Sequence, residues 1–180
     1  MDQVIWPTVR GMAAEGNRYT GFLYAGLMID AEGNPRVIEF NCRFGDPETQ
    51  PIMLRLQSSL VALVEAALEE RLDQVEAQWD PRPSLGVVLA AGGYPGDYAK
   101  GALISGLDQA VDADGKVFHA GTALKGEQIV TQGGRVLCAT ALGETVGAAQ
   151  SRAYELASRI DWDGCFYRRD IGYRAIAREA

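Results

Sequence analysis

Histidine and cysteine are scarce in this sequence. Its 180 residues include one histidine, His119, and three cysteines, Cys42, Cys138 and Cys165. A single histidine leaves no histidine-based zinc cluster and no obvious His-dependent triad. Three widely spaced cysteines without a CxxC pair indicate reduced thiols in a cytoplasmic protein, and we expect all three to be packing residues.

Long apolar runs and an excess of basic residues are also missing. No run approaches the roughly 20 apolar residues of a membrane-spanning helix, and the first residues do not resemble a signal peptide. The chain has 17 basic and 24 acidic residues, a net charge of -7. A general nucleic-acid-binding surface needs a basic footprint. We therefore expect neither nucleic acid nor a membrane as a partner.

What is present predicts an α+β protein. Residues 4–12 have apolar side chains at helical spacing. Two short apolar segments, 21–30 and 36–41, flank a turn cluster at 31–35 and predict an antiparallel hairpin. The sequence Asp46-Pro47-Glu48 is typical of a helix start with Asp46 as N-cap, and helices are expected to about residue 56 and over 60–72.

A segment with two prolines, residues 78–84, is the expected linker between two domains, 1–80 and 84–180. After it, strands are predicted at 85–91, 116–119, 128–130 and 135–140. Thr145 is the expected cap of a helix whose apolar residues share one face. The second part is thus a small mixed α+β domain of independent size.

The segment with the most chemical information is Glu39 to Arg43. Side chains alternate along a strand, so Glu39 and Asn41 would share one face while Ile38 and Phe40 point into the core. Arg43 continues the Glu39 face if the strand persists. Carboxylate and amide oxygens two residues apart suit a hard cation such as Mg²⁺. The alternative is a solvated strand face, because so short a pattern often arises by chance.

Three other features have a functional and a structural interpretation. Asp46 and Glu48 either contact substrate or form a helix cap and first turn. Residues 92–97 (GGYPGD) form either a backbone cradle for a ligand or a tight turn, and we favour the turn. For His119 we favour a structural hydrogen bond over catalysis.

Residues 19–27 (YTGFLYAGL) and 37–50 (VIEFNCRFGDPETQ) resemble the end of the ATP-grasp domain of glycinamide ribonucleotide synthetases (phosphoribosylamine–glycine ligases). Residues 86–98 (GVVLAAGGYPGDY) resemble the start of that family's C-terminal domain. The similarity continues through residues 117–122 (VFHAGT), 131–137 (TQGGRVL) and 170–175 (DIGYRA). It therefore covers essentially the whole chain, in order.

The resemblance implies an ADP-forming ligase that joins glycine to 5-phosphoribosylamine in purine biosynthesis. It implies that Glu39 and Asn41 bind the Mg²⁺ (or Mn²⁺) of Mg·ATP. Arg43 is expected to act as a catalytic residue that steadies the transferring phosphate or the acyl phosphate. No residue is assigned to ATP itself.

The match departs from the family in two places. Many ATP-grasp enzymes carry a second metal carboxylate on the preceding strand, but residues 21–29 are without acidic side chains and Asp30 stands at the turn. Glu39 is expected to face Gly26. The family's N-terminal domain and ATP-holding lysines are also unmatched, and there is no P-loop. We therefore expect the isolated chain to be inactive, and the alternative is a non-catalytic folded fragment that needs a partner chain or self-associates.

Overall fold

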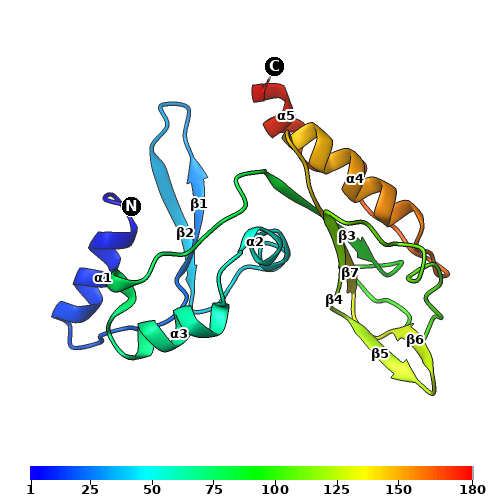
Figure 1. Ribbon diagram of the computed structural model, residues 1–180, viewed down its shortest axis with the longest axis horizontal. Coiled ribbons are helices and arrows are strands. Elements are labelled where there is room, and N and C mark those ends of the chain that lie inside the picture. The colour runs from blue at the N-terminus through cyan, green and yellow to red at the C-terminus, as the bar shows by residue number, and fades with distance from the viewer. Residues whose placement is uncertain (180) are drawn as a thin grey trace. The chain divides into compact units, whose positions relative to one another are not determined.

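The computed structural model describes residues 1–179, which form two compact units (Figure 1). Unit 1 comprises Met1–Asp46 and Ser58–Gln78, and unit 2 comprises Pro47–Gln57 and Trp79–Ala180. Both units combine helices with antiparallel strands, which confirms the α+β class. Residues 47–57 belong to unit 2, although the sequence placed them within the first domain. The domain ranges 1–80 and 84–180 stay a prediction.

Unit 1 is built around the predicted hairpin. Asp30 Oδ1 accepts hydrogen bonds from the backbone of Asn34 at 2.7 Å, and Gly33 has φ +85, so the turn residues close the hairpin locally. Asn41 pairs with Tyr24 across the two strands. The elements are α1 (Ile5–Ala14), β1 (Tyr24–Ile29), β2 (Pro35–Asn41), α3 (Leu60–Leu68) and the 3₁₀ helix η1 (Leu72–Gln74).

The expectation that Ile38 and Phe40 point into a core is wrong. Ile38 is 66% exposed and Phe40 is 40% exposed. The alternation along β2 is real, but no second layer among residues 1–179 buries this strand, whose residues are exposed or half-buried. Unit 1 therefore keeps much apolar surface in solvent, including Leu27, Met28, Ile29 and Val37.

Helix α3 ends earlier than the predicted residue 72. Glu70 adopts a left-handed conformation, with φ 55, and its amide donates to the carbonyl of Ala67. The amide of Arg71 donates to the carbonyl of Ala66 at 2.9 Å. These two bonds form a Schellman-type helix end. The periodicity of the sequence continues past this point, which is why the pattern overestimated the helix length.

Unit 2 contains a three-stranded antiparallel sheet in the order β3-β7-β4. Val87 of β3 and Val117 of β4 both pair with Ala139 of the central strand β7. Strands β5 and β6 form a separate hairpin. The bounds are β3 (Ser84–Ala90), β4 (Gly115–His119), β5 (Thr122–Lys125), β6 (Gln128–Thr131) and β7 (Arg135–Leu142).

Helices cover both faces of this sheet. On one face, α4 (Val146–Ser158) packs Ala149, Ala153 and Leu156 against buried side chains of the strands. On the other face lies α2 (Thr49–Arg55), because a Cβ on Gly86 would meet Pro51 Cγ at 3.4 Å and Gly86 alternates with buried neighbours on β3. Unit 2 thus has a core, formed chiefly by Leu85, Val87, Leu89, Val136, Leu137 and Leu156.

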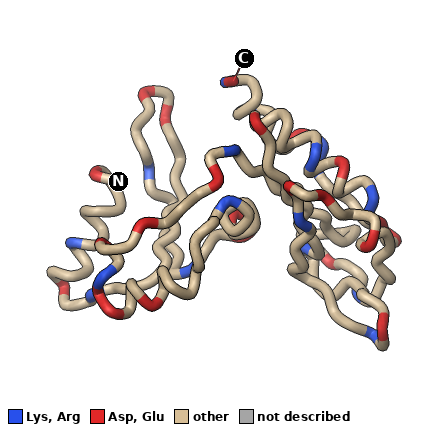
Figure 2. Tube along the Cα trace, in the orientation of Figure 1, with Lys and Arg blue, Asp and Glu red and all other residues tan. Residues whose placement is uncertain are grey.

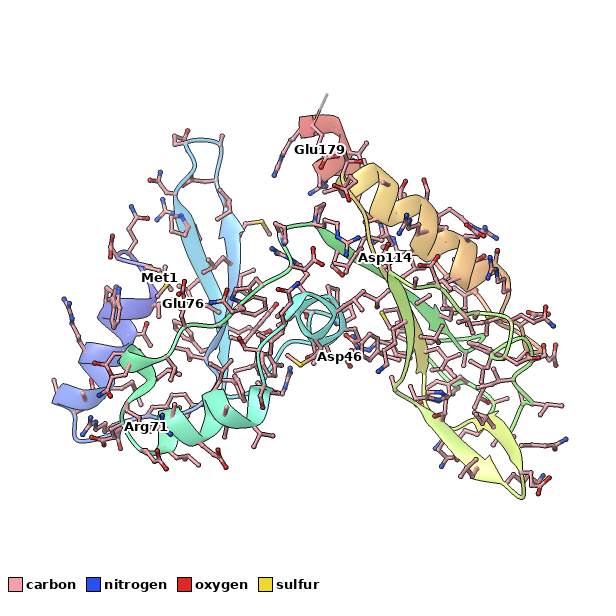
Figure 3. All side chains as sticks on the ribbon, in the orientation of Figure 1. Met1, Asp46, Arg71, Glu76, Asp114 and Glu179 are labelled. Carbon is pink, nitrogen blue, oxygen red and sulfur yellow. The ribbon has the colours of Figure 1, made fainter. Side chains whose placement is uncertain are left out.

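Three elements were missed by sequence reasoning: the 3₁₀ helix η1, strand β5 and the C-terminal helix α5 (Tyr173–Glu179). The Glu179 carboxylate accepts hydrogen bonds from the amide of Val146, at 2.8 and 3.1 Å, at the start of α4 (Figure 3). The predicted cap is confirmed, because Thr145 Oγ1 accepts from the amide of Ala148 at 3.1 Å. Both groups satisfy amides that the helix leaves without internal partners.

Lys and Arg positions alternate with Asp and Glu positions along the traces of both units (Figure 2). Over residues 1–179, no helix has the length and apolar character that a membrane crossing requires.

Candidate metal and nucleotide site

The predicted site residues Glu39 and Asn41 lie at the end of β2. They are two residues apart on one strand, so their side chains project from the same face. Glu39 pairs with Gly26 and Asn41 with Tyr24 across the hairpin. The expected position of Glu39 opposite Gly26 is therefore confirmed.

Glycine at position 26 leaves room for the Glu39 side chain. A Cβ built on Gly26 would approach Glu39 Cγ to 3.0 Å and Glu39 Oε1 to 3.7 Å. Within residues 1–179, no hydrogen bond or ion pair engages the Glu39 carboxylate. The Asn41 side-chain nitrogen Nδ2 is buried and has no hydrogen-bond partner in the described part of the chain. The Glu39 carboxylate is thus uncommitted beside the space left by Gly26, and the Asn41 amide nitrogen is left without a partner.

This pair fits a Mg²⁺ ion that is shared with a nucleotide. Magnesium is commonly held by one or two protein oxygens and completes its shell with water and phosphate oxygens. The described residues hold no group of three or more His, Cys, Asp or Glu that could bind a metal by themselves. Glu39 and Asn41 would therefore supply two oxygen ligands and leave the remaining positions to the nucleotide.

Asp30 does not supply the second carboxylate. It accepts from the backbone and side chain of Asn34 and lies 3.5 Å from Arg36 Nε, so it is committed to the turn. The backbone hydrogen bond from Asn34 is the main cause that lowers the pKa of Asp30. The acid-free strand β1 agrees with the departure noted in the sequence.

Arg43 lies beyond the strand, so the condition for its place on the same face as Glu39, a strand that persists to residue 43, is not met. Strand β2 ends at Asn41, and Arg43 Nη1 donates to the Phe44 carbonyl at 2.8 Å. The ring of Phe44 stacks on Phe22 at 4.0 Å between centroids, which holds this segment against the start of β1. A catalytic role for exposed Arg43 stays a prediction.

The prediction that Asp46 is the N-cap of α2 is also wrong. Residues 46–48 form a turn, and α2 begins at Thr49 with Glu48 as N-cap and no capping side-chain bond. The first helical hydrogen bond runs from the Ile52 amide to the Glu48 carbonyl. Contact of Asp46 or Glu48 with substrate stays a prediction.

The glycine-rich segment 92–97 forms a turn, as favoured. The amide of Tyr94 donates to the Ala91 carbonyl at 3.0 Å, and the amide of Gly96 donates to the Gly93 carbonyl at 2.8 Å. These amides are used within the loop and are not free to bind an anion. His119 Nδ1 lies 3.0 Å from Thr122 Oγ1, which supports its structural role.

The cysteines differ in their surroundings. Cys138 is buried, and Cys165 is half-buried, where burial raises the pKa of its thiol to about 11. Cys42 is exposed, so its expected packing role is wrong. No disulfide joins the three cysteines in the described part of the chain.

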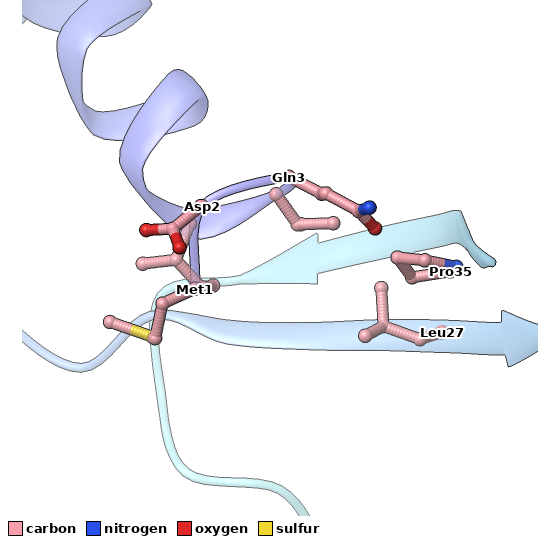
Figure 4. Close-up of a pocket in the computed structure, with 7 residues that line it drawn as sticks. Met1, Asp2, Gln3, Leu27 and Pro35 are labelled. Carbon is pink, nitrogen blue, oxygen red and sulfur yellow. The ribbon is translucent and has the colours of Figure 1, made fainter. Parts of the chain in front are cut away.

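A separate hollow in unit 1 lies beside the N-terminal segment and not at Glu39 (Figure 4). Leu27 and Pro35 of the hairpin line it together with residues 1–5. Most of its lining side chains are apolar, and none of them is a basic side chain that could hold a phosphate.

Unit 2 contains an ion-pair network that sequence reasoning missed. Arg82 donates to both carboxylate oxygens of Asp80, from Nε at 3.0 Å and Nη2 at 2.8 Å, and to Asp114 Oδ1 at 3.0 Å. Arg152 donates to Asp114 Oδ2 at 2.6 Å. The partners stand as far as 38 residues apart, so no local spacing indicated them.

Comparison with known proteins places the first part of the chain in the ATP-grasp class. Residues 1–49 match the family description "Phosphoribosylglycinamide synthetase, ATP-grasp (A) domain". The fold is also shared with the biotin carboxylase domain of Hydrogenobacter thermophilus 2-oxoglutarate carboxylase, solved in complex with MgADP. That structure is 17% identical with a TM-score of 0.61, over 90% of this chain and 36% of the other.

Residues 84–174 match "Phosphoribosylglycinamide synthetase, C domain". The chain therefore belongs to the phosphoribosylglycinamide synthetase family. It is 78% identical to the phosphoribosylamine–glycine ligase of Pseudomonas syringae pv. tomato and 76% identical to that of Pseudomonas aeruginosa, over 99% of this chain in both cases. The chain spans 42% of the length of these relatives. The solved Thermotoga maritima ligase is 39% identical, with a TM-score of 0.74 over 89% of this chain and 39% of that one.

Proposed function

We propose that this chain supplies the metal-binding strand and the C-terminal domain of a phosphoribosylamine–glycine ligase. The observation that carries the proposal is the uncommitted pair Glu39 and Asn41 on β2, beside the space left by Gly26. The pair stands within residues 1–49, which match the ATP-grasp domain of this family. Its substrates would be ATP, glycine and 5-phosphoribosylamine, in the cytoplasm.

The proposed reaction has two steps. A glycine carboxylate oxygen attacks the γ-phosphorus of ATP, which breaks the bond to ADP and forms glycyl phosphate. The amine of phosphoribosylamine then attacks the glycyl carbonyl carbon, phosphate leaves, and the nitrogen loses a proton. A bound Mg²⁺ would offset the negative charge of the phosphates.

The side chains of this chain would hold and orient the reacting groups. Glu39 and Asn41 would fix the position of the metal with oxygen ligands from a rigid strand. Arg43 has a planar guanidinium suited to a phosphate or acyl phosphate, with one nitrogen already held by the Phe44 carbonyl. Residues 1–80 would complete an ATP-grasp domain and residues 84–180 would form the C-terminal domain.

An assay of ADP formation that depends on both glycine and phosphoribosylamine tests the proposal. The chain is assayed alone and mixed with a separately produced N-terminal portion of such a ligase. We expect activity only in the mixture. Glu39→Gln and Asn41→Ala should each lower turnover by about 10–100-fold, because the first replaces a charged ligand with a neutral amide and the second removes a ligand. Glu32→Gln, on the exposed turn of the same hairpin, is the matched control.

A second candidate function has its own observation. The hairpin exposes apolar side chains on both strands, including Met28 at 61% and Ile38 at 66%. A surface of this kind favours a non-catalytic fragment that needs a partner chain or self-associates. If the mixture forms no ADP although the partner and the variants are folded, that result would favour this candidate. Wild-type turnover in both site variants would instead remove the metal assignment.

A further inference from the structure

Helix α2 is a part of unit 2 that directly follows the Arg43 segment in the chain. Its residues pack on the sheet of unit 2, where Pro51 lies against the surface at Gly86. The five residues 42–46 are all that separate the end of β2 from the part of the chain that belongs to unit 2. The place of α2 therefore sets one end of the segment that carries Arg43.

The C-terminal end of α2 is held by an exchange of hydrogen bonds with Asp80. The Asp80 amide donates to the Arg55 carbonyl at 2.8 Å. In return, Arg55 Nε and Nη2 both donate to the Asp80 carbonyl, at 3.1 and 3.0 Å. The residue that holds α2 in place is thus Asp80, through its backbone.

The carboxylate of Asp80 is in turn stabilised by Arg82. The Asp80 residue is 8% exposed, so its carboxylate is costly to bury without a partner. Arg82 supplies two side-chain donors and its own amide, at 2.9 Å, to that carboxylate. The same guanidinium reaches Asp114, which Arg152 of α4 also holds. A continuous polar chain therefore connects α2 with α4.

From this geometry we infer that Arg82 is a positioning residue of the ligase. It anchors α2 on unit 2 through Asp80 and Arg55, and so fixes one end of the 42–46 segment. Its importance for the reaction rests on the proposed function, because Arg43 matters only if this chain takes part in the ligase. Its effect on α2 and on the segment does not depend on that proposal.

Two measurements on the 180-residue chain test the inference without any activity. The first is hydrogen exchange of the α2 amides in Arg82→Met. We expect exchange in peptide 47–57 to become about tenfold faster, because the buried Asp80 carboxylate loses its side-chain partners and releases Arg55. The matched control is Arg168→Met, which breaks an exposed pair with Asp170 and should leave this peptide unchanged.

The second measurement reports on the segment itself. A nitroxide is attached to exposed Cys42 in a Cys165→Ser background, with Cys138 protected by burial. We expect Arg82→Met, but not Arg168→Met, to shift the electron paramagnetic resonance spectrum toward a mobile line shape. A residue that only stabilises unit 2 would not change this spectrum.

Each outcome decides the inference. Unchanged exchange in peptide 47–57 overturns the anchoring role, and an unchanged Cys42 spectrum overturns the positioning role even if exchange rises. If Arg82→Met does not fold, Arg82→Lys serves in its place, because a lysine keeps the charge but cannot hold both carboxylates with a fork of donors. Failure of the ligase assay would leave both readouts intact, so the two proposals can fail separately.

Discussion

Position 106 in unit 2 has a backbone conformation and a steric environment that only glycine fits. Its φ of +81 lies in the left-handed region, and a Cβ there would fall on the carbonyl oxygen of Arg159. Gly126 has a similar φ of +63 but no atom within 4 Å of its Cβ position. The two positions therefore separate backbone strain from steric overlap.

We predict that Gly106→Ala lowers the free energy of unfolding by about 3 kcal/mol, since strain and overlap add. Gly126→Ala should cost about 1 kcal/mol from strain alone. Urea denaturation followed by circular dichroism gives both values. Equal losses in the two variants would contradict the overlap at Arg159.

The candidate site shows which residue-level features a sequence can predict. The position of Glu39 opposite Gly26 follows from a short turn and strict alternation, both of which are local. The exposure of Ile38 and Phe40 was not predictable in this way, because alternation says which residues share a face and not whether another layer covers it. The place of Arg43 on the Glu39 face required the strand to persist, and β2 ends at Asn41, two residues before Arg43.

At the scale of elements, local signals predicted the hairpin, the capped helix α4 and four of the five strands of the second part. They failed where distant partners decide the structure. Nothing within residues 46–57 indicates that α2 packs on Gly86, more than 30 residues later, and Arg82 finds Asp114 across 32 residues. The early end of α3 at a left-handed Glu70 likewise left no glycine signal in the sequence.

The ion-pair network should give unit 2 a distinct stability in acid. Hydrogen bonds from the Arg82 side chain and amide lower the pKa of Asp80 from 3.8 to about 2, with Arg55 adding a smaller effect. Hydrogen bonds from Arg152, and then from Arg82, lower the pKa of Asp114. The carboxylate of Asp112 also interacts with Arg152. A carboxylate with a depressed folded pKa stabilises the fold above its unfolded pKa and loses that contribution as the pH falls through the folded value.

We therefore predict that the unfolding free energy of the wild-type chain falls more steeply between pH 4 and pH 2 than that of Arg82→Met. The difference between the two should be largest above pH 4 and should shrink toward pH 2. Urea titrations at a series of pH values, followed by near-ultraviolet circular dichroism, measure it. Parallel curves for the two proteins would show that Arg82 does not set the acid response.

At the scale of the whole molecule, the two units differ in how well they bury their apolar side chains. Unit 2 has a continuous core, whereas Val4 and Ala66 are the buried apolar side chains of unit 1 among residues 1–179. The exposed hairpin should therefore make the isolated chain associate with itself as its concentration rises.

Light scattering over a concentration series tests this expectation. We predict that the double variant Met28→Ser, Ile38→Ser lowers the apparent mass toward that of one chain. Leu124→Ser is the control, because Leu124 is 76% exposed on unit 2, a larger fraction than Met28 or Ile38. An equal effect of the control would show that association does not run through the hairpin.

The place of α2 in unit 2 has a consequence for synthesis on the ribosome. Helix α2 ends at Arg55, and its partner strand β7 begins at Arg135, 80 residues later. At a synthesis rate of about 5–20 residues per second, the central strand of the sheet is synthesised about 4–16 s after the helix. During that interval the 47–57 segment has its contact surface exposed to chaperones, and the polypeptide of unit 1 is completed around it before unit 2 can close.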